Sequence, residues 1–426
     1  MITGIFFLIG IIILIGLAGH LLFSKTRIPQ TLYLMGIGIL LGPIYGIING
    51  NSLNDYNTFI SSMALLIILL DSGSSLDLFS VLKGFSKAIY FTLLVFAMSM
   101  LMVGLFGHYV LGMSWFAAVI LGIISSGTAT VTVTTLIGPL NIGQSTKQLL
   151  VLESIVNDLT IVLGVTFALS IFGLKTFTFA QASSQLIGPL AIGIVFGVGV
   201  AIIWMYIVAF FLESTELIYV FTLGVLFVLY DTVQFLSGLG IIAGFVFTIL
   251  LGNFHNIFAR LKADTTALQS KTIRGLRDLS FVGSDITFFV KTFFFVYLGV
   301  IFDFKLLTLN LVLMVVGLIM VVVILRFVCA YILSLWDKGF APDIFLMAIM
   351  MPRGFVATVM ALVVTQSGVD LPNLKEIMLL TVFVSTFFSI IGSIVFDKFR
   401  PAPKKLPVKT PEEVILNQQL PYYGPQ

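Results

Sequence analysis

The sequence predicts an all-helical protein that crosses a membrane many times. The chain of 426 residues is 59% hydrophobic and only 10% charged, and its mean hydropathy is +1.15. Soluble globular domains contain about 25% charged residues, so the composition excludes that class. Apolar runs recur to about residue 398 and are continuous rather than alternating, which predicts helices and not a β-barrel. The single cysteine, Cys329, excludes an intrachain disulfide and a cysteine-based metal cluster.

Thirteen apolar segments follow one another along the chain, and most reach the roughly 20 residues that a helix needs to cross a bilayer. The first lacks the basic stretch and the cleavage site of a signal peptide, so we predict a retained helix there. The ninth is short for a spanning helix. The predicted spans are 3–23, 30–50, 57–78, 88–111, 114–138, 149–173, 184–211, 214–233, 235–252, 284–303, 306–335, 342–366 and 376–397.

Basic residues are distributed unevenly between the two sets of loops that thirteen spans create. In membrane proteins, Lys and Arg gather in the cytoplasmic loops. One set, which includes the C-terminal tail, carries most of them, whereas the other carries only Lys175, Lys305 and Lys375. The sequence therefore predicts a multi-pass protein of the cell membrane, with the N-terminus outside and the C-terminus in the cytoplasm.

Two polar regions lie between or after the spans. The loop at 253–280 mixes charged residues with Leu and Ile, which is typical of an amphipathic helix at the cytoplasmic face. Residues 401–426 are polar and rich in proline, and they predict a disordered cytoplasmic tail. The remaining residues, 1–400, are predicted to form one transmembrane domain.

Helix-breaking residues interrupt the fifth and the twelfth segments. The first interruption contains Ser125, Gly127 and Thr128, and the second runs from Met351 through Pro352 to Gly354. Transporters built from inverted repeats often break one helix in each half at matching positions, and the unwound backbone serves a binding site. The offset of seven segments predicts two inverted six-helix repeats joined by the seventh segment. Alternatively, the small residues only allow close helix packing.

A polar stretch, Glu153 to Asp158, lies inside the apolar sixth segment. Charged groups in hydrocarbon cost several kcal/mol unless paired, so they mark functional sites. Ser154 and Asp158 are four residues apart and share a helix face. A carboxylate with a hydroxyl and free backbone carbonyls around Thr128 suits a small hard cation, for which protons compete. We therefore predict cation and proton exchange at Asp158; the alternative is a permanent ion pair.

Other charged residues within the predicted spans have supporting roles. Glu153 is turned away from Asp158, and we predict a structural ion pair with Arg326 rather than with Arg353, whose role would be to stabilise the core. Asp71 either supports the site or faces a water-filled vestibule. Lys291 has no predicted role in exchange.

These motifs resemble the cation–proton antiporter superfamily, in particular its sodium/proton exchanger (NhaP-like) branch. Glu153 to Asp158 is similar to that branch's ES-x-x-ND signature, and Met351 to Gly354 to its G-x-RG helix. The segments 28–43 and 292–300 resemble its second helix and its FFxxxG segment. The resemblance covers about residues 5–398.

The resemblance implies a homodimer and an elevator-like movement of a core, here about 88–173 and 306–397, against dimerisation and scaffold helices. We predict that Asp158, Asn157, Ser154 and Thr128 bind the cation or the proton, and that Asp71 and Thr130 support the site or line its access path. Asn157 resembles the electroneutral members. One departure concerns the ion: Ala129 stands where many sodium/proton exchangers have an aspartate, which leaves both Na⁺ and K⁺ open.

Three other functions compete with antiport. A sodium-coupled symporter of an organic solute also uses broken-helix repeats, but no additional polar cluster marks a solute pocket. A membrane sensor has no use for the buried carboxylates, and a channel lacks a repeated filter motif. Nothing in the sequence predicts an enzyme, a cofactor or a nucleic-acid partner; the predicted partners are protons, a monovalent cation and the lipid bilayer.

Overall fold

The computed structural model consists of helices and turns throughout the residues that it describes, which are 10, 13–14, 29–48, 50, 57–75, 78–172, 179–211, 215–254, 257, 286–369, 371 and 373–399. Within these residues, six helices are long and apolar enough to cross a membrane. The all-helical prediction is therefore confirmed. The first predicted span lies almost wholly outside the described residues, as do most of the loop at 253–280 and all of the tail at 401–426.

The helices follow the predicted spans closely, with two predicted segments each present as a pair of short helices. The bounds are α2 Gln30–Ile39, continued by a π-helical turn at Leu40–Ile44, α3 Asn57–Ser75, α4 Leu78–Tyr109, α5 Trp115–Ile124, α6 Thr130–Ile137, α7 Gln144–Ile171, α8 Phe179–Phe211, α9 Thr215–Phe235, α10 Gly240–Gly252, the helix Ile286–Val300, α13 Leu309–Trp336, α14 Ile344–Ile349, α15 Phe355–Gln366 and α16 Leu374–Phe399. The predicted interruptions are the breaks between α5 and α6 and between α14 and α15.

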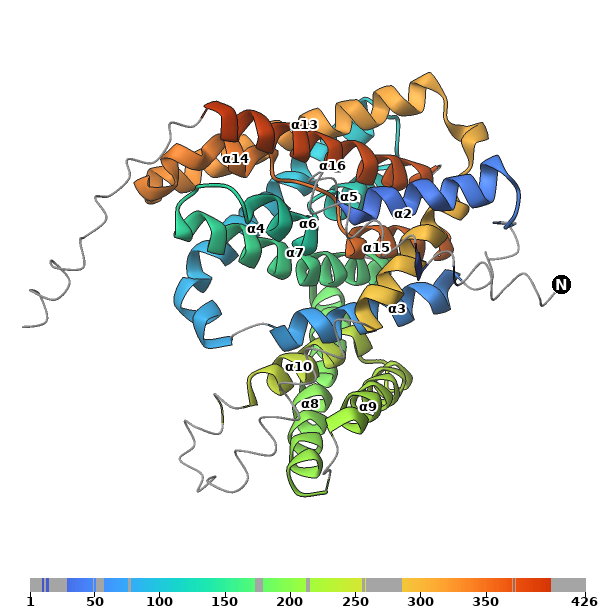
Figure 1. The fold of residues 1–426 in the computed structure, drawn as a ribbon, viewed down its shortest axis with the longest axis vertical. Coiled ribbons are helices and arrows are strands. Elements are labelled where there is room, and N and C mark those ends of the chain that lie inside the picture. The colour runs from blue at the N-terminus through green and yellow to red at the C-terminus, as the bar shows by residue number, and fades with distance from the viewer. Residues whose placement is uncertain are drawn as a thin grey trace, which may run out of the picture.

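The buried apolar side chains form two clusters. The larger one joins α4 to α7, α13 to α16, α2 and the helix Ile286–Val300. The smaller one joins α8, α9 and α10 to α3 and includes Trp204, Leu226 and Phe247. Figure 1 shows α8, α9 and α10 together at one end of the molecule, apart from α13, α14 and α16. The predicted division into a core and a scaffold follows this arrangement and stays a prediction.

Glycines bring α2 and the helix Ile286–Val300 into backbone contact. A Cβ atom at Gly38 would lie 2.0 Å from the Val296 carbonyl oxygen, and one at Gly299 would lie 2.2 Å from the Met35 carbonyl oxygen. Any side chain at either position would force the helices apart, so the two helices behave as one packed unit. This contact fixes the position of residues earlier in the helix Ile286–Val300, including Lys291, beside the start of α2.

Candidate functional site

The two broken helices meet inside the larger cluster. The Ala129 backbone N–H donates to the Pro352 carbonyl over 2.7 Å, which joins the two breaks directly. Gly354 permits this approach, since a Cβ there would lie 3.1 Å from the Ala129 Cα. Breaks of this kind leave the end of one short helix and the start of the next in the middle of the bundle, where backbone groups need partners. The surrounding side chains supply them.

Glu153 and Arg326 form a buried, bidentate ion pair. Arg326 donates from Nη1 to Glu153 Oε1 over 2.8 Å and from Nη2 to Oε2 over 3.2 Å, and both residues are 0% exposed. The third donor, Arg326 Nε, bonds the Met347 carbonyl at the end of α14 over 3.1 Å. The guanidinium also lies over the Phe91 ring of α4, at 5.6 Å from its centroid. The pair that the sequence predicted is in place, and it joins α4, α7, α13 and α14.

Asn157 and Ser154 have internal partners. Asn157 donates from Nδ2 to the Ser126 carbonyl over 2.7 Å and accepts from Ser126 Oγ over 3.2 Å, so it secures the α5–α6 break. Ser154 Oγ donates to the Val151 carbonyl in its own helix over 2.8 Å. Both side chains are fully buried, and neither lines the cavity next to Asp158. The structure thus does not bring these two predicted ligands to the cavity, because their polar atoms are engaged within the core.

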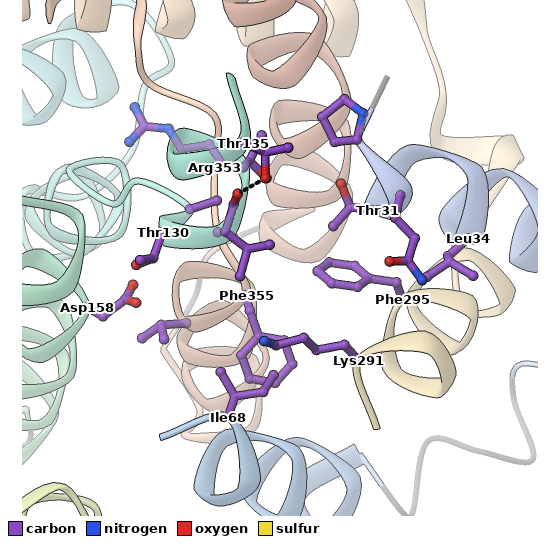
Figure 2. A pocket seen from close by; sticks show the side chains of 17 residues that line it. Thr31, Leu34, Ile68, Thr130, Thr135, Asp158, Lys291, Phe295, Arg353 and Phe355 are labelled. Carbon is purple, nitrogen blue, oxygen red and sulfur yellow. Dashed lines mark hydrogen bonds between the residues drawn. The ribbon is translucent and has the colours of Figure 1, made fainter. Parts of the chain in front are cut away.

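Asp158 lines a cavity of about 300 Å³ between α2, α3, α6, α7, α15 and the helix Ile286–Val300. Thr130, at the start of α6, interacts with the Asp158 carboxylate, and Figure 2 shows their oxygens pointing toward one another. Thr130, which we predicted only as a nearby residue, is therefore closer to the candidate site than Ser154. The lining residues are Pro29, Gln30, Thr31, Leu34, Ile68, Ala129, Thr130, Val131, Thr132, Thr135, Asp158, Lys291, Phe295, Arg353, Gly354, Phe355 and Val356.

Thr128 is buried at the α5–α6 break. Its Oγ1 has no hydrogen-bond partner among the described residues, and the same is true of Ser125 Oγ. A buried hydroxyl without a partner can take a bound ion or water, although Thr128, like Ser154 and Asn157, does not line the cavity. Asp71 falls in α3, but its side chain lies outside the described part of the chain.

Arg353 and two serines of α16 supply further hydrogen bonds where the two broken helices meet. Sequence reasoning missed the serines. Arg353 donates from Nη1 to the Gly127 carbonyl beyond the end of α5, where a positive charge balances the helix dipole. Ser385 Oγ accepts the Arg353 backbone N–H over 3.0 Å. Ser389 Oγ accepts the Met351 N–H over 3.3 Å and donates to the Ile349 carbonyl over 2.9 Å. Two serines four residues apart on an apolar helix share a face, which was the available signal.

Lys291 is the other residue that sequence reasoning underrated. It lines the cavity from the helix Ile286–Val300, and Figure 2 shows it on the side opposite Asp158. Its positive charge interacts with the Asp158 carboxylate. Of the charged residues that line the cavity, Asp158 lies on α7, Lys291 on the neighbouring packed unit, and Arg353 at the α14–α15 break.

Comparison with known proteins gives a consistent result. The profile of the family described as sodium/hydrogen exchanger, transmembrane, matches residues 9–397. A solved structure of the sodium proton antiporter MjNhaP1 from Methanocaldococcus jannaschii at pH 8 superposes with a TM-score of 0.73 at 19% identity, covering 91% of this chain and 94% of that one. An electron-microscopy structure of the same protein gives a TM-score of 0.70 at 20% identity, with coverage of 93% and 95%. No curated protein sequence matches the chain.

Proposed function

Because this chain belongs to the sodium/hydrogen exchanger family, we propose that it exchanges protons for a monovalent cation, Na⁺ or K⁺, at the carboxylate of Asp158. One observation carries the assignment to this residue. Of the two carboxylates on α7, Glu153 is held by both oxygens in an ion pair, whereas Asp158 lines a cavity. A carboxylate in a cavity can take up a proton or a cation, and the two exclude each other.

The site would hold the cation with few ligands. Asp158 supplies the negative charge, Thr130 supplies a neighbouring hydroxyl, and the unpartnered Thr128 hydroxyl lies at the adjacent break. Water within the cavity would complete the coordination shell of a Na⁺ or K⁺ ion. Asn157 is neutral, so binding of one cation or one proton would change the charge of the site equally. That equality supports electroneutral exchange.

The position of the cavity supports alternating access. Pro29 and Gln30, at the start of α2, are among the residues that line it, and this end of α2 follows a loop that the charge distribution assigns to the cytoplasm. We infer from this that Asp158 would be reached from the cytoplasmic side in this conformation. Asp158 and Thr130 lie on the core, and α2 lies on the opposing wall, so a sliding movement of the core past that wall would carry the site across the membrane. The helices outside the core would form the scaffold and contact a second copy in a homodimer, as the resemblance implies.

The test is exchange by purified protein in vesicles. Na⁺, K⁺ and Li⁺ are added in parallel assays, and Na⁺ or K⁺ should dissipate a preformed proton gradient. Asp158→Asn should abolish this response. Asp303→Asn is the matched control, because Asp303 is an exposed carboxylate at the start of a surface turn. Equal responses from the wild type and Asp158→Asn would exclude Asp158 as the exchange group. Uptake of an organic solute without cation–proton exchange would favour a symporter instead.

A further inference from the structure

Lys291 occupies an unusual place for a lysine in a cation pathway. It lines the same cavity as Asp158, among apolar residues that include Ile68 and Phe295, and its charge interacts with the Asp158 carboxylate. Apolar walls strengthen such an interaction relative to open water, because the local dielectric is lower. A fixed positive charge here opposes the entry of any cation, so its presence needs a functional reason.

The two charges lie on different groups of helices, which pack against each other within the larger cluster. Lys291 is on the helix that contacts α2 backbone to backbone at Gly299. Asp158 is on α7, which is attached to α13 and α14 through Arg326. An attraction between Lys291 and Asp158 therefore acts across the surface along which the two units would slide.

The other charged groups near Asp158 whose side chains the structure describes are directed elsewhere. Glu153 is held by Arg326 within the core, although its charge still acts on Asp158 along the same helix. Arg353 lines the cavity through part of its side chain, but its guanidinium points away in Figure 2 and bonds the Gly127 carbonyl. Among the charged residues that line the cavity in the described part of the chain, Lys291 is thus the one that faces Asp158 from the opposing wall.

We propose that Lys291 is a tethered counter-ion that sets the cation affinity of the site and holds the unloaded core in place. This inference rests on the proposed exchange at Asp158. When Asp158 is ionised and empty, the Lys291 ammonium attracts it and resists movement of the core. When a proton or a cation neutralises Asp158, the attraction disappears and the core is released. Only the loaded core then crosses readily, which is the condition for coupled exchange.

The first test separates affinity from rate. In vesicles at alkaline pH, where protons compete least, Lys291→Gln should lower the apparent KM for the transported cation about tenfold, since one nearby unit charge is removed. Lys291→Arg keeps the charge and should retain a KM near that of the wild type. Lys305→Gln, which removes an exposed lysine outside the cavity, should leave KM unchanged. A lowered maximal rate with an unaltered KM in Lys291→Gln would indicate a structural defect only and would contradict the counter-ion.

The second test measures the return of the empty core. Vesicles loaded with the transported cation are diluted into cation-free buffer at alkaline pH, and efflux is followed with a membrane potential imposed. Wild type and Lys291→Arg should release the cation slowly, and Lys291→Gln about tenfold faster, because the empty site no longer holds the core. If the glutamine variant fails to fold, Lys291→Met removes the same charge with a side chain that suits the apolar wall.

The outcomes distinguish this inference from the proposed function. Absence of cation–proton exchange in the wild type would overturn the proposed function itself. Exchange in the wild type together with an unchanged KM and an unchanged leak in the neutral Lys291 variants would overturn the counter-ion. A lowered KM in Lys291→Arg equal to that in Lys291→Gln would do the same, because the effect would then not be one of charge.

Discussion

Glu153 and Asp158 are carboxylates on one helix, five residues apart, and their surroundings differ in almost every respect. Glu153 is 0% exposed, and a guanidinium holds both of its oxygens. Asp158 lines a cavity, where it meets a threonine hydroxyl and, across the space, a lysine on another packed unit. The role of a buried carboxylate on this helix therefore depends on its partner. A partner fixed in the same unit gives a structural pair, and a partner across a cavity leaves the carboxylate free to exchange its ligand.

Removing the partner of Glu153 should have the largest effect on stability. Arg326→Leu leaves a buried carboxylate without a counter-charge and the Met347 carbonyl without its donor. Breaking a buried pair in this way typically costs about 3–5 kcal/mol. We expect a correspondingly large loss of stability in thermal unfolding of the purified protein in detergent, whereas Asp158→Asn should unfold close to the wild type.

A double variant is the control for the arginine substitution. Glu153→Gln combined with Arg326→Leu removes both charges, so no unpaired ion stays buried, and much of the lost stability should return. If Arg326→Leu and Asp158→Asn were equally stable, the distinction between a structural and an exchangeable carboxylate would be wrong.

A second carboxylate at the cavity should increase the affinity of the Asp158 site for the cation. Ala129 precedes the first residue of α6 and lines the cavity, in an extended conformation that an aspartate also adopts at a helix N-cap. Ala129→Asp adds negative charge beside Asp158, so we expect the apparent KM for the transported cation to fall about tenfold and the preference for Na⁺ over K⁺ to rise.

Ala129→Asn is the matched control, since it adds a similar shape without charge. The measurement is the cation dependence of proton-gradient dissipation with Na⁺ and K⁺ in parallel. Equal KM values for the aspartate and asparagine variants would mean that Ala129 does not face the bound ion.

The fold was largely predictable from the sequence, because spanning helices are dictated by length and hydropathy. The breaks were also predictable, since proline, glycine and hydroxyl residues interrupted the fifth and twelfth segments. The Glu153–Arg326 contact followed from the need of an intramembrane carboxylate for a counter-charge. Each of these conclusions depends on a requirement that holds wherever the helices pack.

The details of the site were less predictable, because helix spacing does not say which face meets a neighbour. Ser154 shares a face with Asp158, yet it is buried and bonds its own helix. Asn157 bonds Ser126 at the facing break. The positions of Lys291 at the cavity and of Ser385 and Ser389 at the α14–α15 break depend on contacts between helices far apart in the sequence. The proposed cation ligands and the ion itself stay predictions.

Helix α16 also stabilises the α14–α15 break, and a serine substitution measures how much stability it contributes. Ser389→Ala removes the donor to the Ile349 carbonyl and the acceptor of the Met351 N–H at the α14–α15 break. A buried hydrogen bond contributes about 1 kcal/mol, so we expect a loss of about 1–2 kcal/mol in stability. Ser393→Ala is the matched control on the same helix, because Ser393 bonds only the Ile390 carbonyl within α16. Comparable unfolding of the two variants would show that the break does not depend on α16.

The partly exposed ion pair between Lys87 and Asp337 should have the smallest effect on stability. Their side chains are 45% and 33% exposed, and Asp337 lies just beyond the end of α13. The hydrogen bond from Lys87, with help from the Gly339 N–H, holds the pKa of Asp337 below its usual value. A carboxyl with a lowered pKa stabilises the folded state fully above its usual pKa of about 4 and loses that contribution as the pH falls through the lowered pKa.

The melting temperature of the wild type should therefore exceed that of Asp337→Asn slightly at pH 7, and the difference should close only in strong acid. High salt should reduce the difference at pH 7, because exposed pairs are screened, whereas the buried Glu153–Arg326 pair should hardly respond. A difference that grows on acidification would contradict the assignment, since protonated Asp337 no longer attracts Lys87.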